Sequence, residues 1–252
     1  MIGMITKDAY ENGYYEQALK ISKLVLTVVT SLGTVMIPRI GYHYSKGDTE
    51  MVKTYMYRAY RFVWLCGIPL TLGLIAVSSN FVPWFFGSGY EKVVSLLGVL
   101  SMLILAIGIN NVTGMQYLIP TERQTLFTIT VIIGAVANFV LNFVLIRFLQ
   151  SLGAAIASVV AETTIAVIQI YIVRRELSPY QIIKSGIHYY IAGGIMFVIL
   201  MNIKNVFTPS ILHTLALVII GAVIYGVALV LMRDEFLLVN ANNIIKKILK
   251  RC

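Results

Sequence analysis

The sequence predicts an all-α protein that crosses a membrane repeatedly, as one bundle of about seven transmembrane helices. Hydrophobic residues make up 58% of the 252 residues and charged residues only 12%, whereas a soluble domain averages about 25% charged residues. The mean hydropathy is +0.84. Seven segments are apolar enough to cross a bilayer, which takes about 20 helical residues.

The predicted spans follow one another with short connections, and together they fill most of the chain. The first is the weakest, because Ser22, Lys23 and Thr27 dilute it. We expect one transmembrane domain over residues 1–252, with an outside N-terminal segment over 1–20 and a basic cytoplasmic tail over 234–252. The spans are Ile21–Ile37, Phe62–Phe81, Val93–Ile119, Leu126–Phe148, Leu152–Val173, Gly186–Ile203 and Ile211–Met232.

Basic residues predict the orientation of these spans. Fourteen of the twenty Lys and Arg residues fall in the loops and tail of one side, and six fall on the other. Loops rich in Lys and Arg stay in the cytoplasm. The N-terminus is therefore expected outside and the C-terminus in the cytoplasm of a multi-pass cell-membrane protein.

Two segments on the basic side have the composition of membrane-surface helices. The run "DTEMVKTYMYRAYRF" opens at Asp48, a plausible helix cap, and is rich in tyrosine, which favours the headgroup layer. The tail "NNIIKKILKRC" sets isoleucines beside basic residues. We expect each to form a short helix on the cytoplasmic membrane surface, where anionic lipid would bind it.

The sequence does not indicate a metal site, a phosphate-binding loop or a nucleic-acid site. The two cysteines, Cys66 and Cys252, form no cluster with metal-ligand spacing, and His43, His188 and His213 stand alone. The glycine-rich spots match no phosphate-binding loop. The net charge of +9 is explained by cytoplasmic loops rather than by nucleic acid. We predict no metal, no cofactor and no enzymatic activity.

Amides recur in the third and fourth spans. Asn110, Asn111 and Gln116 lie in the third, and Asn138 and Asn142 in the fourth. The i, i+4 spacing of the last two stacks them on one helix face. Such amides either join helices by hydrogen bonds or line a hydrated cavity that touches a sugar, and the spacing leaves both open.

The fifth span carries one carboxylate, Glu162. Gly153, Ala157 and Ala161 repeat every four residues, a pattern that permits close helix packing. Glu162 lies on the neighbouring stripe, so it is expected to face protein or a cavity and not lipid. An ionisable group inside a membrane is a functional candidate by default. It could be protonated and hydrogen-bonded, pair with a basic residue, or bind an ion during transport.

Three arginines stand near the cytoplasmic ends of the first two spans: Arg39, Arg58 and Arg61. Guanidinium groups grip phosphate oxygens bidentately, so these residues are candidates for binding a pyrophosphate. The general excess of basic residues in cytoplasmic loops explains these three arginines equally well.

Four stretches resemble the second half of Wzx-type polysaccharide flippases, of the multidrug/oligosaccharidyl-lipid/polysaccharide exporter superfamily. They are "GYYEQALKISKL" with "LGTVMIPRI", "VPWFFGSGYEKVVSLLGVLS", "GMQYLIPTERQTLFTITVIIGAVANFVLNFVLI" and "LGAAIASVVAETT". The similarity runs from about residue 10 to 180. Each stretch taken alone is only weakly specific, so the resemblance depends on the order and spacing of the four stretches.

The resemblance implies a carrier that moves undecaprenyl-pyrophosphate-linked oligosaccharide from the cytoplasmic to the outer leaflet. It implies about fourteen helices in two bundles around a central cavity. Glu162, Asn138, Asn142, Gln116 and Asn111 become candidates for that cavity, and Arg123 joins the pyrophosphate candidates. Lipid-linked oligosaccharide, membrane lipids and polysaccharide-assembly proteins are the implied partners.

The chain departs from the family pattern in two ways. Its seven spans match the later half alone, so we expect a truncated or split form that needs an N-terminal half. Second, the loop before "LGAA" often carries Pro and Gly in relatives, whereas here it reads "RFLQS", with Arg147 in an unusual place.

Other functions compete with the flippase. A cation-coupled drug antiporter of the same superfamily needs acidic residues in its spans, and Glu162 is the one that qualifies. A polysaccharide polymerase or acyltransferase usually has large outside loops with His or Arg clusters, which this sequence lacks. The remaining alternative is that the chain is an inactive fragment, which assembles with a partner half.

Overall fold

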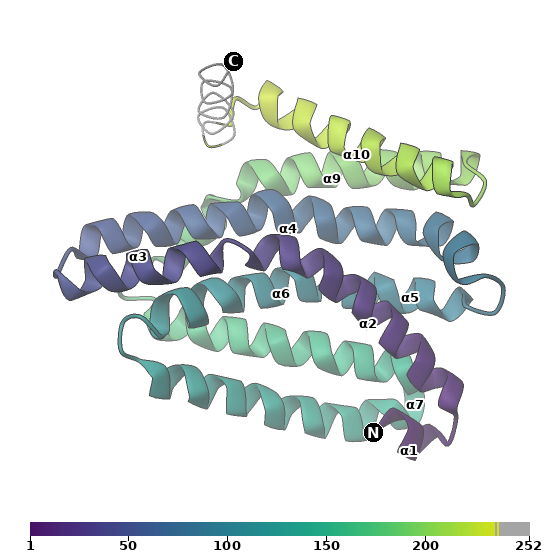
Figure 1. Ribbon diagram of the computed structural model, residues 1–252, viewed down its shortest axis with the longest axis horizontal. Coiled ribbons are helices and arrows are strands. Elements are labelled where there is room, and N and C mark those ends of the chain that lie inside the picture. Colours follow the sequence, from purple (N-terminus) through teal and green to yellow (C-terminus); the bar gives the residue numbers. More distant parts are fainter. Residues whose placement is uncertain (235, 237–252) are drawn as a thin grey trace.

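The computed structural model describes residues 1–234 and 236, and within them every regular element is helical (Figure 1). The long helices lie roughly side by side, so that most connections gather at two opposite ends. The helices are α1 (Ile2–Thr6), α2 (Ala9–Thr30), α3 (Gly33–Ser45), α4 (Thr49–Phe86), α5 (Glu91–Leu100), α6 (Leu103–Asn110), α7 (Gln124–Val173), α8 (Pro179–Lys184), α9 (Ile187–Ile203) and α10 (Ile211–Leu231), with a π-helical segment η1 (Asn111–Leu118) and a 3₁₀ turn η2 (Lys204–Val206).

Within the described residues, six continuous helical stretches are long and apolar enough to cross a membrane, and the 50-residue stretch is long enough to cross it twice. A straight helix of that length would measure about 75 Å, more than twice the hydrocarbon thickness. The chain instead reverses at Gln150, whose φ of 53° and ψ of −130° are not helical, and Figure 1 shows α7 doubling back. We call residues 124–149 its first limb and 151–173 its second limb. The prediction of about seven transmembrane helices is confirmed.

The first span is longer than predicted. Asp8 caps α2 by accepting a hydrogen bond from the Tyr10 backbone N–H at 2.8 Å, so helix begins at Ala9 rather than at Ile21. Glu11 and Ala18 are already buried. A turn at residues 31–32 separates α2 from α3. Much of the segment predicted as the outside N-terminus is thus part of a packed helix.

The predicted surface helix after Asp48 is wrong as a separate element. Asp48 does cap a helix, because its side chain accepts a hydrogen bond from the Met51 backbone N–H at 3.1 Å. That helix is α4, which continues without a break to Phe86. Val52, Met56 and Tyr60 are buried against neighbouring helices, and this packing extends the second span instead of leaving a segment on the membrane surface. The basic tail lies outside the described residues except for 234 and 236.

Small residues determine how α7 packs. The predicted seam is confirmed, since Gly153, Ala157 and Ala161 are all buried. A Cβ at Gly134 of the first limb would come within 2.3 Å of the Ile165 side chain of the second limb. The limbs therefore pack closely and antiparallel. Near the open end of the hairpin, the Gln169 side chain donates to the Thr130 hydroxyl at 3.0 Å.

Candidate functional site

A polar groove of about 480 Å³ opens between α2, α6 and the two limbs of α7. Its polar side chains come from three of these elements, and two of them, Asn138 and Glu162, lie near the middle of the two limbs of α7. Polar groups so far from the ends of an apolar helix are costly in a membrane unless they are used or hydrogen-bonded. The polar residues of the lining are Tyr15, Lys23, Asn138, Ser158 and Glu162.

Glu162 lines this groove. Its Oε2 accepts a hydrogen bond from Asn110 Nδ2 at 2.6 Å, and the same nitrogen lies 3.1 Å from the Glu162 carbonyl oxygen. The Glu162 side chain is half-buried, and no ion pair among the described residues includes it. The amide oxygen of Asn110 is buried without a protein partner. This arrangement matches the hydrogen-bonded reading of Glu162 and leaves its second carboxylate oxygen available to the groove.

Asn138 and Asn142 are stacked as their spacing predicted. Asn142 Nδ2 donates to Asn138 Oδ1 at 2.8 Å and to its carbonyl oxygen at 2.9 Å. Asn138 lines the groove, and Asn142 lies one turn further along the first limb. The Asn142 amide therefore orients the Asn138 amide, which is the one in contact with the groove.

Two groove residues were missed by sequence reasoning. The hydroxyl of Tyr15 lies 3.0 Å from that of Ser158, across the interface between α2 and the second limb of α7. Lys23 is exposed and lines the same groove as Glu162. In the sequence, Tyr15 has the character of an aromatic residue at the membrane interface, and Lys23 only lowers the hydropathy of a weak span. Neither residue therefore indicates that the two line one cavity.

Asn111 and Gln116 lie elsewhere. Both belong to η1, where Gln116 Nε2 donates to Asn111 Oδ1 at 2.9 Å. A Cβ at Gly33 would come within 2.9 Å of that same oxygen. The pair therefore packs against the start of α3, and neither residue lines the groove.

The four arginine candidates do not line the groove either. Arg39 and Arg58 are exposed on α3 and α4. The Arg61 guanidinium carbon lies 5.9 Å from the centre of the Phe236 ring. Arg123 Nη1 donates to Glu176 Oε2 at 2.8 Å. A pyrophosphate would have to compete with Glu176 for Arg123.

The Arg123–Glu176 pair lies outside the spans, at the turn before α7 and just after its end. Burial alone would raise the pKa of Glu176, but hydrogen bonds from Arg123 and Tyr117 and the Arg123 charge hold that pKa below its usual value. Burial alone would lower the pKa of the Arg123 guanidinium, but the hydrogen bond to Glu176 and the charge of that carboxylate raise it. The pair ties together the two ends of the α7 hairpin.

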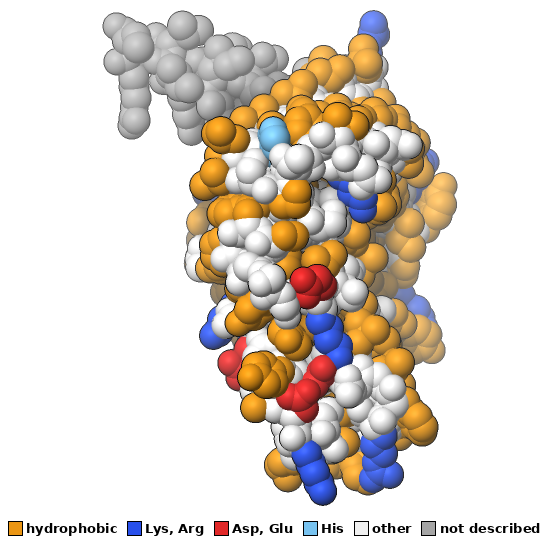
Figure 2. Space-filling view, turned by 90° about the vertical axis from the view of Figure 1, so that its right-hand side faces the viewer, with side chains coloured by type: hydrophobic (Ala, Val, Ile, Leu, Met, Phe, Trp, Pro, Cys, Tyr) orange, Lys and Arg blue, Asp and Glu red, His pale blue; other side chains and the backbone are white. Residues whose placement is uncertain are grey.

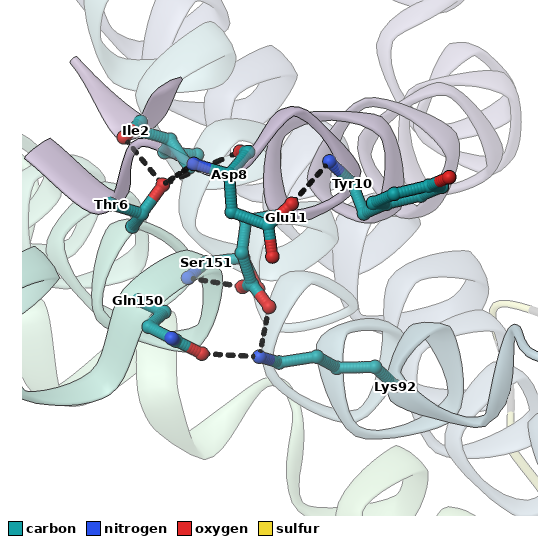
Figure 3. Close-up of polar contacts among 8 residues, drawn as sticks. All are labelled: Ile2, Thr6, Asp8, Tyr10, Glu11, Lys92, Gln150 and Ser151. Carbon is teal, nitrogen blue, oxygen red and sulfur yellow. Dashed lines mark hydrogen bonds and ion pairs between the residues drawn. The ribbon is translucent and has the colours of Figure 1, made fainter. Parts of the chain in front are cut away.

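A second charge contact, in which the carboxylate is buried, closes the opposite end, and sequence reasoning missed it as well (Figure 3). Glu11 is 5% exposed and pairs with Lys92 of α5, while its Oε2 accepts from the Ser151 backbone N–H at 3.1 Å. Lys92 also donates to Gln150 Oε1 at 2.8 Å. Figure 2 looks onto this end and shows acidic and basic side chains adjoining in its middle, with hydrophobic side chains around them. No local pattern links residues so far apart in the chain.

Arg147 stands next to this reversal. Its guanidinium carbon lies 4.1 Å from the centre of the Phe143 ring, and the side chain is exposed. The chain reverses directly at Gln150, three residues further on.

Comparisons with known proteins agree with the all-helical fold. The model of the family described as "Lipid II flippase MurJ" matches residues 13–226. The "Lipopolysaccharide biosynthesis protein WzxC" of Escherichia coli (strain K12) is 33% identical over 67 residues, which are 27% of this chain and 14% of that protein. A solved structure, "Lipid II flippase MurJ, inward closed conformation", has a TM-score of 0.74 and 18% identity. The alignment covers 90% of this chain and 48% of that one, so the chain spans about half the length of the solved relative.

Proposed function

Because the chain belongs to the lipid II flippase MurJ family, we propose that it carries a lipid-linked oligosaccharide across the cell membrane as part of an exporter. The observation that carries this proposal is the groove whose lining includes Asn138 and Glu162, near the middle of the two apolar limbs of α7. Such a carrier makes and breaks no covalent bond. The cargo we propose is an undecaprenyl-pyrophosphate-linked unit for polysaccharide biosynthesis.

The chemistry of the groove suits the sugar part of that cargo. Glu162 offers a carboxylate oxygen, Asn138 an amide, and Tyr15 and Ser158 a pair of hydroxyls. These groups accept and donate hydrogen bonds, as sugar hydroxyls require. The apolar groups between them include Ile107 and Phe139, which can cover the faces of sugar rings. The pyrophosphate would bind apart from the groove, with Arg39, Arg58, Arg61 and Arg123 as candidates at the basic end.

A second bundle would complete the path. The solved relative is about twice as long as the matched region, and transporters commonly place their substrate between two repeats that rock against each other. We infer that the groove faces such a partner half, whether encoded in the same chain or separately. The basic loops place the N-terminus outside and the C-terminus in the cytoplasm in this proposal.

The Glu162→Gln substitution tests the proposal. The protein is reconstituted in vesicles with a polyprenyl-pyrophosphate-linked oligosaccharide, and both cargo binding and exposure of its sugar to an external glycosidase are measured. Loss of one charged hydrogen-bonding group should weaken binding about tenfold or more. Glu50→Gln is the matched control, because Glu50 is highly exposed on α4, far in sequence from the groove lining. Equal cargo binding by the Glu162 variant and the unaltered protein would sink the proposed role of the groove.

The alternative is a cation-coupled drug antiporter of the same superfamily. The groove offers it one carboxylate, Glu162, with Lys23 in the same lining. Dye efflux from the same vesicles that follows a sodium or proton gradient, without oligosaccharide binding, would favour that function over the flippase.

A further inference from the structure

A patch of exposed basic and aromatic side chains surrounds the junction between α7 and α8. We call it the α7–α8 surface. Tyr171 is 64% exposed, Tyr180 68% and Ile183 60%, and the three cations among them are exposed as well. The surface consists of Tyr171, Arg174, Arg175, Tyr180, Ile183 and Lys184. It lies at the end of the molecule where the α3–α4 turn and the start of α7 also lie (Figure 1).

The inner side of this segment is firmly attached to the bundle. Leu177 and Ile182 are fully buried. Trp64 Nε1 donates to the Ile182 carbonyl oxygen at 3.0 Å, and the Ser178 backbone N–H donates to the Tyr57 hydroxyl at 3.0 Å. Because α4 holds α8 through these contacts, the outward direction of the exposed side chains is determined by the fold.

The positive charge of the surface is not neutralised within the described chain. Glu176 is the one acidic residue between Tyr171 and Ile187, and it already binds Arg123 and Tyr117. None of the ion pairs among the described residues includes Arg174, Arg175 or Lys184.

Two of the cations rest on tyrosine rings. The guanidinium carbon of Arg174 lies 3.5 Å from the centre of the Tyr171 ring, and Lys184 Nζ lies 5.6 Å from that of Tyr180. Tyrosine favours the boundary between hydrocarbon and headgroups. A cation held over such a ring is therefore held at headgroup level.

We propose that the α7–α8 surface binds the phosphate headgroup of an anionic phospholipid from the surrounding membrane. Arg174 and Arg175 are exposed neighbours in the sequence, and guanidinium groups suit bidentate contact with phosphate oxygens. Lys184 adds a third positive charge, and Tyr180 with Ile183 lies against the first part of an acyl chain. Charge complementarity selects an anionic lipid over a zwitterionic one. This site does not depend on the proposed transport function.

Native mass spectrometry of the detergent-purified protein, titrated with phosphatidylglycerol or with phosphatidylcholine, tests the proposal. The unaltered protein should prefer phosphatidylglycerol, and Arg174→Gln/Arg175→Gln should weaken that binding about tenfold or more, since each basic residue near an anionic surface contributes about a fivefold effect. The matched control, Lys46→Gln/Lys53→Gln, removes two charges from the α3–α4 turn and the start of α4 at the same end, and should change binding less than twofold.

Further variants distinguish a built site from diffuse attraction. Arg174→Lys/Arg175→Lys keeps the charge and the fold but loses bidentate geometry, so it should bind phosphatidylglycerol several-fold more weakly. Equal losses in the Arg174/Arg175 and Lys46/Lys53 variants, or unchanged binding in the lysine variant, would show attraction by net charge alone and overturn the proposal. Competition by millimolar inorganic phosphate as effective as that by lipid would also overturn it, because the site would then recognise a free ion.

Discussion

The Glu11 carboxylate accepts a hydrogen bond from the Ser151 backbone N–H at 3.1 Å, although 140 positions separate the two residues. Ser151 opens the second limb of α7, where the first N–H groups of a helix lack partners within it. Glu11 supplies one, and its negative charge suits a helix N-terminus. The same carboxylate pairs with Lys92. One buried side chain thus joins α2, α5 and the reversal of α7.

Removal of this carboxylate should destabilise the bundle. Glu11→Gln leaves Lys92 without its ion pair and weakens the bond from Ser151, and hydrogen bonds to charged groups each contribute about 1.5–3 kcal/mol. We expect a comparable loss in the free energy of unfolding, measured by denaturant titration in detergent. Glu16→Gln is the control, since Glu16 is exposed on the same helix. Equal effects of the two variants would contradict the role given to the Glu11 contact.

Gln150→Gly should stabilise the protein. The φ of 53° and ψ of −130° at Gln150 strain any residue with a Cβ, at a cost of about 1–3 kcal/mol that glycine avoids. The substitution also removes the hydrogen bond from the Lys92 ammonium to Gln150 Oε1. Because this bond is exposed to solvent, it contributes less than the buried bonds to Glu11, about 1 kcal/mol or less. Strain relief is the larger effect, so the midpoint of thermal unfolding should rise. Gln150→Ala loses the bond and keeps the strain, and it should lower the midpoint.

Acid should weaken the link between Arg123 and Glu176. Because the pKa of Glu176 is held below its usual value of 4.5, the pair stabilises the folded protein above that pH. The stabilisation is lost as the pH falls through the depressed pKa of the folded state. The two side chains are 26% and 40% exposed, so the contribution is about 1 kcal/mol or less. Unfolding free energies at pH 7 and pH 3.5 should differ less for Glu176→Gln than for the unaltered protein, and an unchanged difference would contradict this.

The proposed orientation predicts which turns are accessible from outside the cell. After replacement of Cys66 and Cys252 by serine, single cysteines are placed at Ser45, the last residue of α3, and at Ser88, in the α4–α5 turn. A membrane-impermeant maleimide should label Ser88→Cys in intact cells, and Ser45→Cys only after the cells are opened. Both positions are exposed. The reverse pattern would refute the orientation inferred from the basic loops.

Much of the fold could be predicted because its signals are local. Hydropathy marked both limbs of α7 as separate spans, and the Gly153–Ala157–Ala161 repeat marked a packing seam that is buried. The i, i+4 spacing of Asn138 and Asn142 predicted a contact within one helix. The start of α2 at Ala9 and the continuity of α4 were missed, because burial against other helices, not local composition, extends these elements.

The sequence by itself determined the class of protein, the number and limits of most spans, and the family resemblance, because each depends on residues close together in the chain. Only the tertiary structure decided which polar groups meet. Asn110 binds Glu162, Glu11 binds Lys92 and Ser151, and Arg123 binds Glu176 instead of standing free. The physical reason is that a hydrogen bond between helices requires a particular rotation and axial offset of both helices. Those quantities follow from how whole helix surfaces pack, which no local pattern specifies.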